Sequence, residues 1–157
     1  MKIARHLASS TILCAFLTMA AGASGADTVY HGSFCNPLPG DVSKIDYNQF
    51  GSFNTSASTG TVNCGAATPI LATINTVQVY AYDRHTPNNV SCTVTLTDIG
   101  GNTIWSGSNA TSVNSPAMQT INFSPGVGTH TVYARCGIPA VTGSGNSVVS
   151  TYRIITP

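Results

Sequence analysis

The chain has 157 residues and 11 charged side chains, six Lys or Arg against five Asp, and no Glu. A predicted export signal over residues 1–26 leaves 131 residues, enough for one domain with a hydrophobic core and too few for multi-domain machinery. This remaining part carries four cations and five aspartates, and its net charge of −1 excludes the basic surface that nucleic-acid binding requires. Thr, Ser and Asn supply 45 of its 131 residues, so we expect a polar exterior of low charge.

The N-terminus has the three parts of a secretory signal peptide. Lys2 and Arg5 precede an apolar stretch over residues 7–21, and small residues follow up to Ala26. The apolar stretch has about 15 residues, whereas a helix that spans a bilayer needs about 20. We therefore expect a secreted protein, in the periplasm, at the cell surface or in the medium, with no membrane span in the mature chain.

Five cysteines occur, and the first of them, Cys14, lies within the predicted signal. The other four form an even number in an exported chain, which favours two disulfide bonds over metal binding or catalysis. Three pairings are formally possible. The four residues are Cys35, Cys64, Cys92 and Cys136.

Strand periodicity distinguishes these pairings. Cys92 falls on the apolar face of the alternating segment 90–96, and Cys136 falls on the apolar face of segment 132–136. Two inward-facing cysteines on separate core strands can meet across the interior. We therefore predict a bridge between Cys92 and Cys136 and, by elimination, a second bridge between the other two cysteines.

Short alternating segments bounded by Gly, Pro, Asn or Asp recur along the chain, and no window after the signal shows sustained helical spacing. The predicted strands are 28–33, 45–53, 60–64, 70–74, 77–83, 90–97, 103–106, 118–123, 129–136 and 148–155. Loops are predicted at 36–40, 85–89, 107–116 and 138–146. This pattern favours one all-β domain over residues 27–157, an antiparallel β-sandwich of immunoglobulin-like or jelly-roll-like type, stapled by disulfides and with minimal helix.

Five short motifs carry a resemblance to a known group of proteins. They are Val62-Asn63-Cys64, Tyr82-Asp83-Arg84, Val90-Ser91-Cys92, Arg135-Cys136-Gly137-Ile138-Pro139 and Ser150-Thr151-Tyr152-Arg153. Through them, most of residues 31–154 resembles a group of small exported bacterial proteins of unassigned function. The resemblance implies a secreted β domain with two disulfides and brings no activity or binding residues. A weaker resemblance, through Phe50-Gly51-Ser52-Phe53 and residues 60–64, is to pilin-like subunits of the spore-coat U type.

Candidate catalytic groups are few. Nucleophilic hydrolysis needs a serine or cysteine beside a base, and the histidines after the signal are His31, His85 and His130. No Gly-x-Ser-x-Gly motif accompanies them. The densest polar cluster, Asp83-Arg84-His85, ends a predicted strand, and we interpret it as an ion pair and a loop cap. We therefore expect no catalytic residue and no enzymatic activity.

Metal-binding patterns are equally scarce, because the sequence has no His-Glu-x-x-His, no Cys-x-x-Cys and no closely spaced histidine pair. Calcium takes about six to eight oxygen ligands and would fit at Asp41 or over residues 98–102. An aspartate that starts a turn is the simpler interpretation of both positions. We expect no cofactor.

The best candidates for binding are aromatic side chains. Within residues 77–82, Gln78, Tyr80 and Tyr82 take one face of the strand and small apolar residues take the other. If the first face is open, Tyr80 and Tyr82, with Trp105 from a nearby strand, form a ledge on which a sugar ring or a partner's side chain can stack. If that face is covered, the three residues belong to the core.

We therefore predict a secreted, non-catalytic module for surface recognition, with a glycan or a protein surface as its partner. The low charge, the polar exterior and the aromatic ledge favour this function. A self-assembling pilin-like or coat-like surface subunit is the first alternative, because many short strands offer exposed edges. The second alternative is a small secreted hydrolase that uses His85 or His130.

Overall fold

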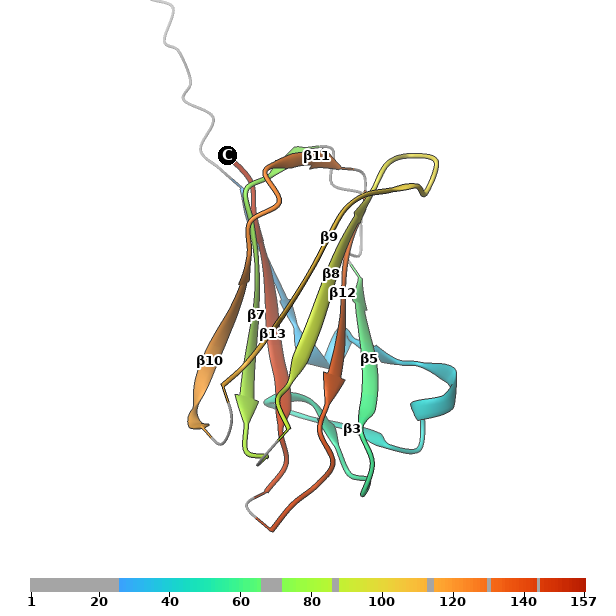
Figure 1. Cartoon of the computed structure of the whole chain (residues 1–157), viewed down its shortest axis with the longest axis vertical. Helices are drawn as coiled ribbons and strands as arrows, with labels where there is room; N and C mark the ends of the chain where they lie inside the picture. Colours follow the sequence, from blue (N-terminus) through green and yellow to red (C-terminus); the bar gives the residue numbers. More distant parts are fainter. Residues whose placement is uncertain (1–25, 66–71, 86–87, 113–114, 130, 144) are drawn as a thin grey trace, which may run out of the picture.

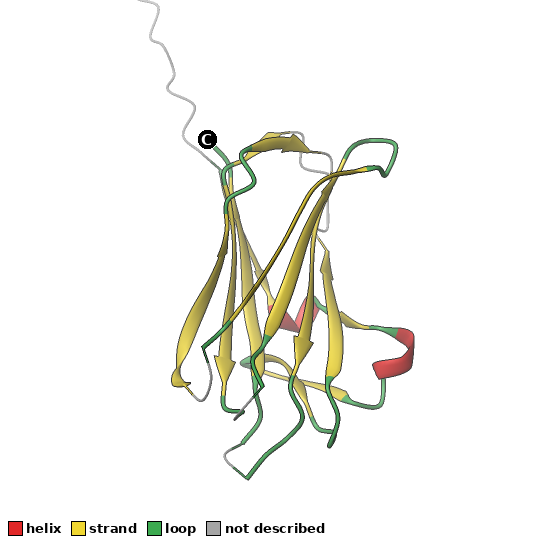
Figure 2. Cartoon of the chain, viewed as in Figure 1, coloured by secondary structure: helices red, strands yellow, loops and turns green. Residues whose placement is uncertain are grey.

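The computed structural model describes residues 26–65, 72–85, 88–112, 115–129, 131–143 and 145–157. Residues 1–25 of the predicted signal therefore lie outside the described residues, as do His130 and the first two residues of predicted strand 70–74. Two antiparallel sheets face each other as a β-sandwich (Figure 1), which confirms the predicted fold class. The described residues contain two short 3₁₀ turns and no α-helix (Figure 2), and no helix among them is long and apolar enough to cross a membrane.

The first sheet, called sheet A here, has six strands. Its order is β10 (Ser115–Phe123), β7 (Thr76–Asp83), β13 (Val148–Ile155), β4 (Gly51–Asn54) and β3 (Ile45–Asn48), with β1 (Asp27–His31) also paired to β13. β7 runs along one side of β13. On the other side of β13, β1 pairs with residues 151–155 and β4 pairs with residues 148–149.

The second sheet, sheet B, has five strands. Its order is β2 (Asn36–Pro37), β5 (Gly60–Gly65), β12 (Thr131–Ile138), β8 (Ser91–Thr97) and β9 (Thr103–Ala110). A separate pair, β11 (Val127–Thr129) and β6 (Ala72–Ile74), lies at one end of the sandwich (Figure 1). The 3₁₀ turns η1 (Gly32–Phe34) and η2 (Pro39–Asp41) flank β2, where the chain crosses from sheet A to sheet B and back.

The hydrophobic core lies between the sheets because their strands alternate in burial. Val77, Val79 and Ala81 of β7 are fully buried on the inner face of sheet A. Val94 and Leu96 of β8 are fully buried on the inner face of sheet B. The alternation read from the sequence therefore identifies which side of each of these strands faces the core.

Side chains add to the backbone ladder that joins β1 to β13. Tyr30 stacks on the buried Tyr152 with the ring centroids 4.6 Å apart. The guanidinium of Arg153 donates to both carboxylate oxygens of Asp27. The ladder pairs Asp27 with Ile155, so the first and last strands of the described chain meet at one end of sheet A.

The structure contains both predicted disulfides, Cys35–Cys64 and Cys92–Cys136. Cys92 and Cys136 lie directly opposite each other on β8 and β12, so this bridge stays within sheet B. The pairing is confirmed, but the expectation that the bridge crosses the interior is wrong, because the two strands are neighbours in one sheet. Cys35 lies between η1 and β2, and its bridge to β5 anchors the segment where the chain enters sheet B.

Several predicted boundaries shift by a few residues, as at β12, which runs over 131–138 where 129–136 was predicted, and three predicted segments differ more clearly from the structure. Predicted strand 45–53 is a hairpin of β3 and β4, because the chain reverses at residues 49–50. Gly51, which follows the turn, has a φ of +128°, and a Cβ there would collide with the Val149 carbonyl oxygen. Predicted loop 107–116 is mostly strand, since β9 continues to Ala110 and β10 begins at Ser115. Predicted loop 36–40 holds β2 and η2. The C-terminal part of β9 is mostly exposed and lacks the apolar alternation that marks a buried strand, so residues 107–110 gave no strand signal.

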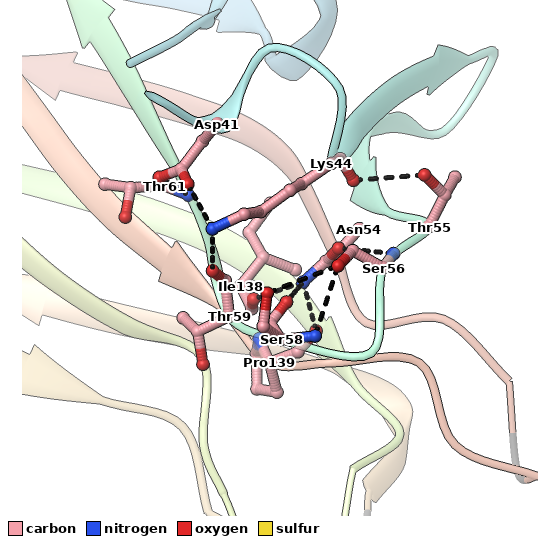
Figure 3. A network of polar contacts seen from close by, with 10 residues as sticks. All are labelled: Asp41, Lys44, Asn54, Thr55, Ser56, Ser58, Thr59, Thr61, Ile138 and Pro139. Atoms are coloured by element: carbon pink, nitrogen blue, oxygen red, sulfur yellow. Dashed lines mark hydrogen bonds and ion pairs between the residues drawn. The ribbon is translucent and has the colours of Figure 1, made fainter. Parts of the chain in front are cut away.

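A polar network joins the β3–β4 hairpin to sheet B (Figure 3). The buried Asn54 donates through Nδ2 to the carbonyl oxygens of Ser58, Ile138 and Pro139 at 2.7, 3.0 and 3.0 Å. Its Oδ1 accepts from the backbone N–H of Ser56 at 2.8 Å. The amide is therefore satisfied at both ends, and it fixes the hairpin against the end of β12.

An ion pair lies at the edge of this network (Figure 3). Lys44 Nζ is 2.6 Å from Asp41 Oδ1, and the backbone N–H of Thr61 donates to Asp41 Oδ2 at 2.9 Å. The hydrogen bond from Lys44 lowers the pKa of Asp41 below its usual value of 3.8, against the opposing effect of burial. Asp41 therefore stays ionised in the folded protein to a lower pH than in the unfolded chain.

This pair predicts a pH-dependent contribution to stability. A carboxylate whose pKa is lowered by folding stabilises the fold above its unfolded pKa, and the contribution is lost as the pH falls through the folded pKa. We expect the difference in free energy of unfolding between the wild type and Asp41→Asn to be largest near neutral pH and to shrink below about pH 4. Urea titrations across this range measure it, with Lys44→Gln as a second variant that should follow the same course. A difference that stays constant with pH would contradict the assignment.

Candidate functional site

The outer face of sheet A carries aromatic side chains from the middle of β7. Apart from Asp83 at its end, the residues of this strand that point inward are apolar and buried, and Tyr80 and Tyr82 point outward. Both tyrosines are only half-buried. They therefore present ring surface to solvent on the outer side of the sandwich.

The strands on either side of β7 place further side chains beside the two rings. On β10, Met118 lies opposite Tyr82 and Thr120 lies opposite Tyr80. On β13, Thr151 lies opposite Tyr80. Met118, on the edge strand β10, is 49% exposed and adds a large apolar side chain to the solvent-facing surface. The face thus combines apolar surface with hydroxyl groups.

Hydrogen bonds hold the polar end of this face in place. Tyr80 donates through its hydroxyl to Gln78 Oε1 at 2.8 Å, and Gln78 Nε2 donates to Asn122 Oδ1 at 2.9 Å. Arg153 donates through Nη1 to Gln78 Oε1 at 3.4 Å and through Nε to Asp27 Oδ1 at 2.7 Å. The hydrogen bond from Arg153 lowers the pKa of Asp27, so the pair stays ionised. The Tyr80 ring is therefore positioned before any ligand arrives, which reduces the entropy lost on binding.

Two concave regions adjoin on this face. The first, which we call the open groove, has a volume of about 520 Å³, and its lining includes Asp27, Tyr80, Tyr82, Met118, Thr151 and Arg153. The second, the end pocket, has a volume of about 350 Å³ and is more enclosed; it is lined by Asn48, Phe50, Phe53, Tyr82, Arg84, Asn146 and Val148. Both volumes fall in the range of about 300 to 1,000 Å³ that is typical of small-molecule sites. Tyr82 lines both, so the two regions meet at this residue.

Trp105 is not part of the ledge. It belongs to β9 in sheet B, opposite Leu96 of β8, and packs partly buried against the core. Its ring lies over the backbone of Gly107, where a Cβ would come within 2.5 Å of the indole. The expected contribution of Trp105 is wrong because β9 pairs with β8, which places the tryptophan in the opposite sheet from Tyr80 and Tyr82.

Several residues of the face were not predicted from the sequence. Met118 and Arg153 occupy outward positions on alternating strands, and that alternation could have shown that they face solvent. Which strands flank β7 could not be read from the pattern. Phe50 and Phe53 were missed because the hairpin that carries them was predicted as one straight strand.

The Asp83-Arg84-His85 cluster contains a loop cap, as predicted. Asp83, fully buried at the end of β7, accepts through Oδ1 from His85 N at 3.1 Å and Ser147 Oγ at 3.2 Å. Its Oδ2 accepts from Val90 N at 3.1 Å and Thr111 Oγ1 at 2.5 Å. The carboxylate therefore ties the end of β7 to the segments that flank β8, β9 and β13.

The described histidines also have structural partners. His85 is buried, and its Nδ1 accepts from the backbone N–H of Asn88 at 3.1 Å. His31 caps η1, with Nδ1 2.8 Å from Ser33 Oγ and 3.2 Å from the backbone nitrogen of Ser33. His130, the other histidine of the predicted hydrolase alternative, lies outside the described residues. Both described imidazoles thus stabilise local turns.

The aspartates considered for calcium are engaged in turns. Asp98 Oδ1 accepts from Asn102 N at 2.8 Å and closes the β8–β9 hairpin. Asp41 is bonded by Lys44 and Thr61 as described above. Over the described ranges, no group of three His, Cys, Asp or Glu side chains is placed to hold a metal ion.

Comparison with known proteins shows the fold. No protein-family model matches the chain, and no curated protein matches it by sequence. Among solved structures, it is similar to the CBM36-1 domain of a multidomain xylanase from the hindgut metagenome of Trinervitermes trinervoides. The TM-score is 0.50 at 13% sequence identity, and the match covers 82% of this chain and 96% of that domain.

Two larger proteins contain a similar sandwich. A family two carbohydrate esterase from Cellvibrio japonicus matches with a TM-score of 0.52 at 5% identity, over 85% of this chain and 34% of its own. An isomalto-dextranase from Arthrobacter globiformis, complexed with panose, matches with a TM-score of 0.50 at 12% identity, over 82% of this chain and 23% of its own. The chain thus spans about a third or less of these two enzymes. At such identities the similarities show a shared β-sandwich fold.

Proposed function

We propose that this protein is a secreted, non-catalytic carbohydrate-binding module, and that it binds its glycan on the outer face of sheet A. The observation that carries the proposal is the position of Tyr82, which lines both the open groove and the end pocket on one solvent-facing surface. The similarity to the CBM36-1 domain of a xylanase supports it at the level of the fold, because that domain has nearly the same extent.

The chemistry of the face suits a sugar chain. Aromatic rings offer flat apolar surface to the carbon-bearing faces of sugar rings, and Tyr80 and Tyr82 provide two such rings two residues apart on one strand. Sugar hydroxyls need hydrogen-bond donors and acceptors at the rim, and Gln78, Thr151 and Arg153 supply both kinds. The face therefore offers stacking in its middle and hydrogen bonding around it.

A non-catalytic role fits the polar clusters that the structure describes. Asp83 has four hydrogen bonds to the surrounding chain, and His85 and His31 cap turns. None of the three lines either concave region. Their arrangement supports a binding function for the outer face of sheet A and a structural one for these groups.

Replacement of Tyr82 by alanine is expected to weaken glycan binding by about tenfold or more, since it removes a ring shared by both concave regions. Tyr80→Ala should weaken binding less, because Tyr80 lines only the open groove. Affinity electrophoresis against plant and microbial polysaccharides identifies a ligand. Calorimetric titration with oligosaccharides of that ligand then measures how much affinity each variant has lost.

Tyr133→Ala is the matched control, because Tyr133 is a half-buried tyrosine on β12 of sheet B, away from both concave regions. It should bind like the wild type. Retention of wild-type affinity by Tyr82→Ala, or failure of the wild type to bind any polysaccharide of the panel, would contradict the proposal.

A further inference from the structure

The end pocket differs from the open groove in its charge. Arg84 is the one charged side chain among the described residues that line the pocket, whereas the lining of the groove includes both a cation, Arg153, and an anion, Asp27. Asn48 and Asn146 add amide groups to the same pocket. Its polar lining is therefore cationic and rich in hydrogen-bond donors.

The fold places the Arg84 side chain at this pocket. β7 alternates so that Tyr82 points outward and Asp83 inward, and Arg84, directly after the strand, lines the same pocket as Tyr82. Arg84 is exposed, and its Nη1 and Cδ lie along the backbone of Gly145, each 3.4 Å from where a Cβ would stand. Arg84 N also donates to Ser147 Oγ at 3.1 Å. Gly145 and Ser147, which precede β13, thus contact Arg84 and help to position it. The guanidinium group of an arginine keeps its positive charge whatever hydrogen bonds it makes.

The nearest acids in the sequence and in the sheet do not line the pocket. Asp83 faces the interior, where four donors surround its carboxylate. Asp46 of β3 lies opposite Phe53 and is exposed, with Oδ1 accepting from Tyr47 N at 2.8 Å. Neither carboxylate is among the residues that line the pocket, so the one charged group of its described lining is the guanidinium of Arg84.

The apolar part of the pocket offers ring surface to a sugar. Phe50 and Phe53 of the β3–β4 hairpin form one wall, and Tyr82 forms the side shared with the open groove. Phe50 is 53% exposed, so its ring is open to a ligand. A volume of about 350 Å³ suits one or two sugar rings, with the chain continuing over Tyr82 into the groove.

From this arrangement we infer that the end pocket binds a sugar that carries a carboxylate, a hexuronic acid, at the end of a glycan chain whose neutral residues lie over Tyr82 and Tyr80. The inference rests on the proposed function and specifies its ligand class. The planar guanidinium of Arg84 matches a carboxylate with two parallel hydrogen bonds, which a neutral hydroxymethyl group cannot replace. The same charge would attract a sulfate ester, so the test includes both anions.

The experiment compares acidic polysaccharides with their carboxyl-reduced forms, in which each uronic acid becomes the neutral sugar of the same configuration. The probes are polygalacturonate, glucuronoxylan and alginate, each with its reduced form, and a sulfated galactan. We expect the wild type to bind at least one acidic form about tenfold more tightly than its reduced form. Arg84→Gln should bring that ratio close to one while retaining affinity for the reduced form, and Arg84→Lys should keep part of the preference.

Arg135→Gln is the control for charge alone, since Arg135 is an exposed arginine on β12 of sheet B. It should leave the ratio unchanged. Equal binding of acidic and reduced forms by the wild type would overturn the inference and leave the proposed function intact, as would a preference for the sulfated galactan alone. Absence of binding to every probe, reduced forms included, would count against both. If Arg84→Gln does not fold, the wild type is measured at low and at high salt instead. The ratio of its affinities for the acidic and the reduced polysaccharide should then fall as salt is added, because salt weakens the attraction between opposite charges. A ratio that does not change with salt would overturn the inference.

Discussion

Replacing Cys92 and Cys136 together by alanine is expected to lower the free energy of unfolding by about 4 kcal/mol. The bridge joins residues 44 positions apart, and a cross-link that closes a loop of this length restricts the unfolded chain by that amount in the loop-entropy description. Both cysteines are buried in the core, so loss of the sulfur atoms adds to the effect. A domain of this size has about 5 to 15 kcal/mol of stability in total, so the variant should unfold at much lower denaturant concentration.

Guanidinium titrations followed by circular dichroism measure this change. The Cys35→Ala, Cys64→Ala double variant is the comparison, and with 29 positions between its cysteines the same description gives a slightly smaller loss of about 3.6 kcal/mol. A loss below about 1 kcal/mol for the Cys92 and Cys136 variant would mean that the bridge contributes little beyond the β8–β12 ladder that already joins these residues.

Asp83→Asn is expected to destabilise the protein by about 2 to 4 kcal/mol, although the change replaces only one oxygen by an NH₂ group. Each carboxylate oxygen of Asp83 accepts from one backbone N–H, His85 N on Oδ1 and Val90 N on Oδ2. An asparagine has one acceptor and one donor at these positions, so in either orientation its NH₂ must face a backbone N–H. Hydroxyl groups can rotate to adapt, but these two N–H groups cannot, and the site is fully buried.

Urea denaturation of Asp83→Asn and of Asp46→Asn provides the measurement and its control. Asp46 is exposed on β3, and its described side-chain hydrogen bond to Tyr47 N is one that an asparagine oxygen can keep. The control should therefore change stability by less than about 0.5 kcal/mol. If Asp83→Asn were equally neutral, the four hydrogen bonds at the end of β7 would not hold the surrounding loops as we describe.

Much of the fold follows from period-two alternation, and the failures have specific physical causes. β7 and β8 were predicted nearly to their ends because each buries one face, and buried faces select apolar residues. β9 was predicted only to Ser106, since its remaining positions are small, polar and exposed, and an edge strand needs no apolar face. The β3–β4 hairpin was not predicted as a hairpin, because Gly51 lies close to Val149 of β13, and a contact between residues so far apart in the sequence leaves no local pattern.

The candidate site was predictable in part for the same reason. Tyr80 and Tyr82 share a strand, so their common face follows from alternation alone. Met118, Arg153 and the end pocket are brought to that face by the strand order, and strand order depends on pairings that local pattern does not specify. Trp105 shows the same limit, because its strand was recognised, but the sheet that contains this strand depends on pairings that the local pattern does not specify.

The antiparallel pairing of β1 with the C-terminal half of β13 determines how the molecule responds to mechanical load. Tension applied between the two ends of the described chain would act across this ladder at one end, where Asp27 is paired with Ile155, and would open it one rung after another instead of sliding the strands past each other. Separation of β1 from β13 would first break the contact between Asp27 and Arg153. Arg153 also donates a hydrogen bond to Gln78, which in turn accepts one from the Tyr80 hydroxyl. A pull on both ends would thus disturb the outer face of sheet A, where we propose that the glycan binds, at an early stage, whereas attachment through one end alone would leave this face unstressed.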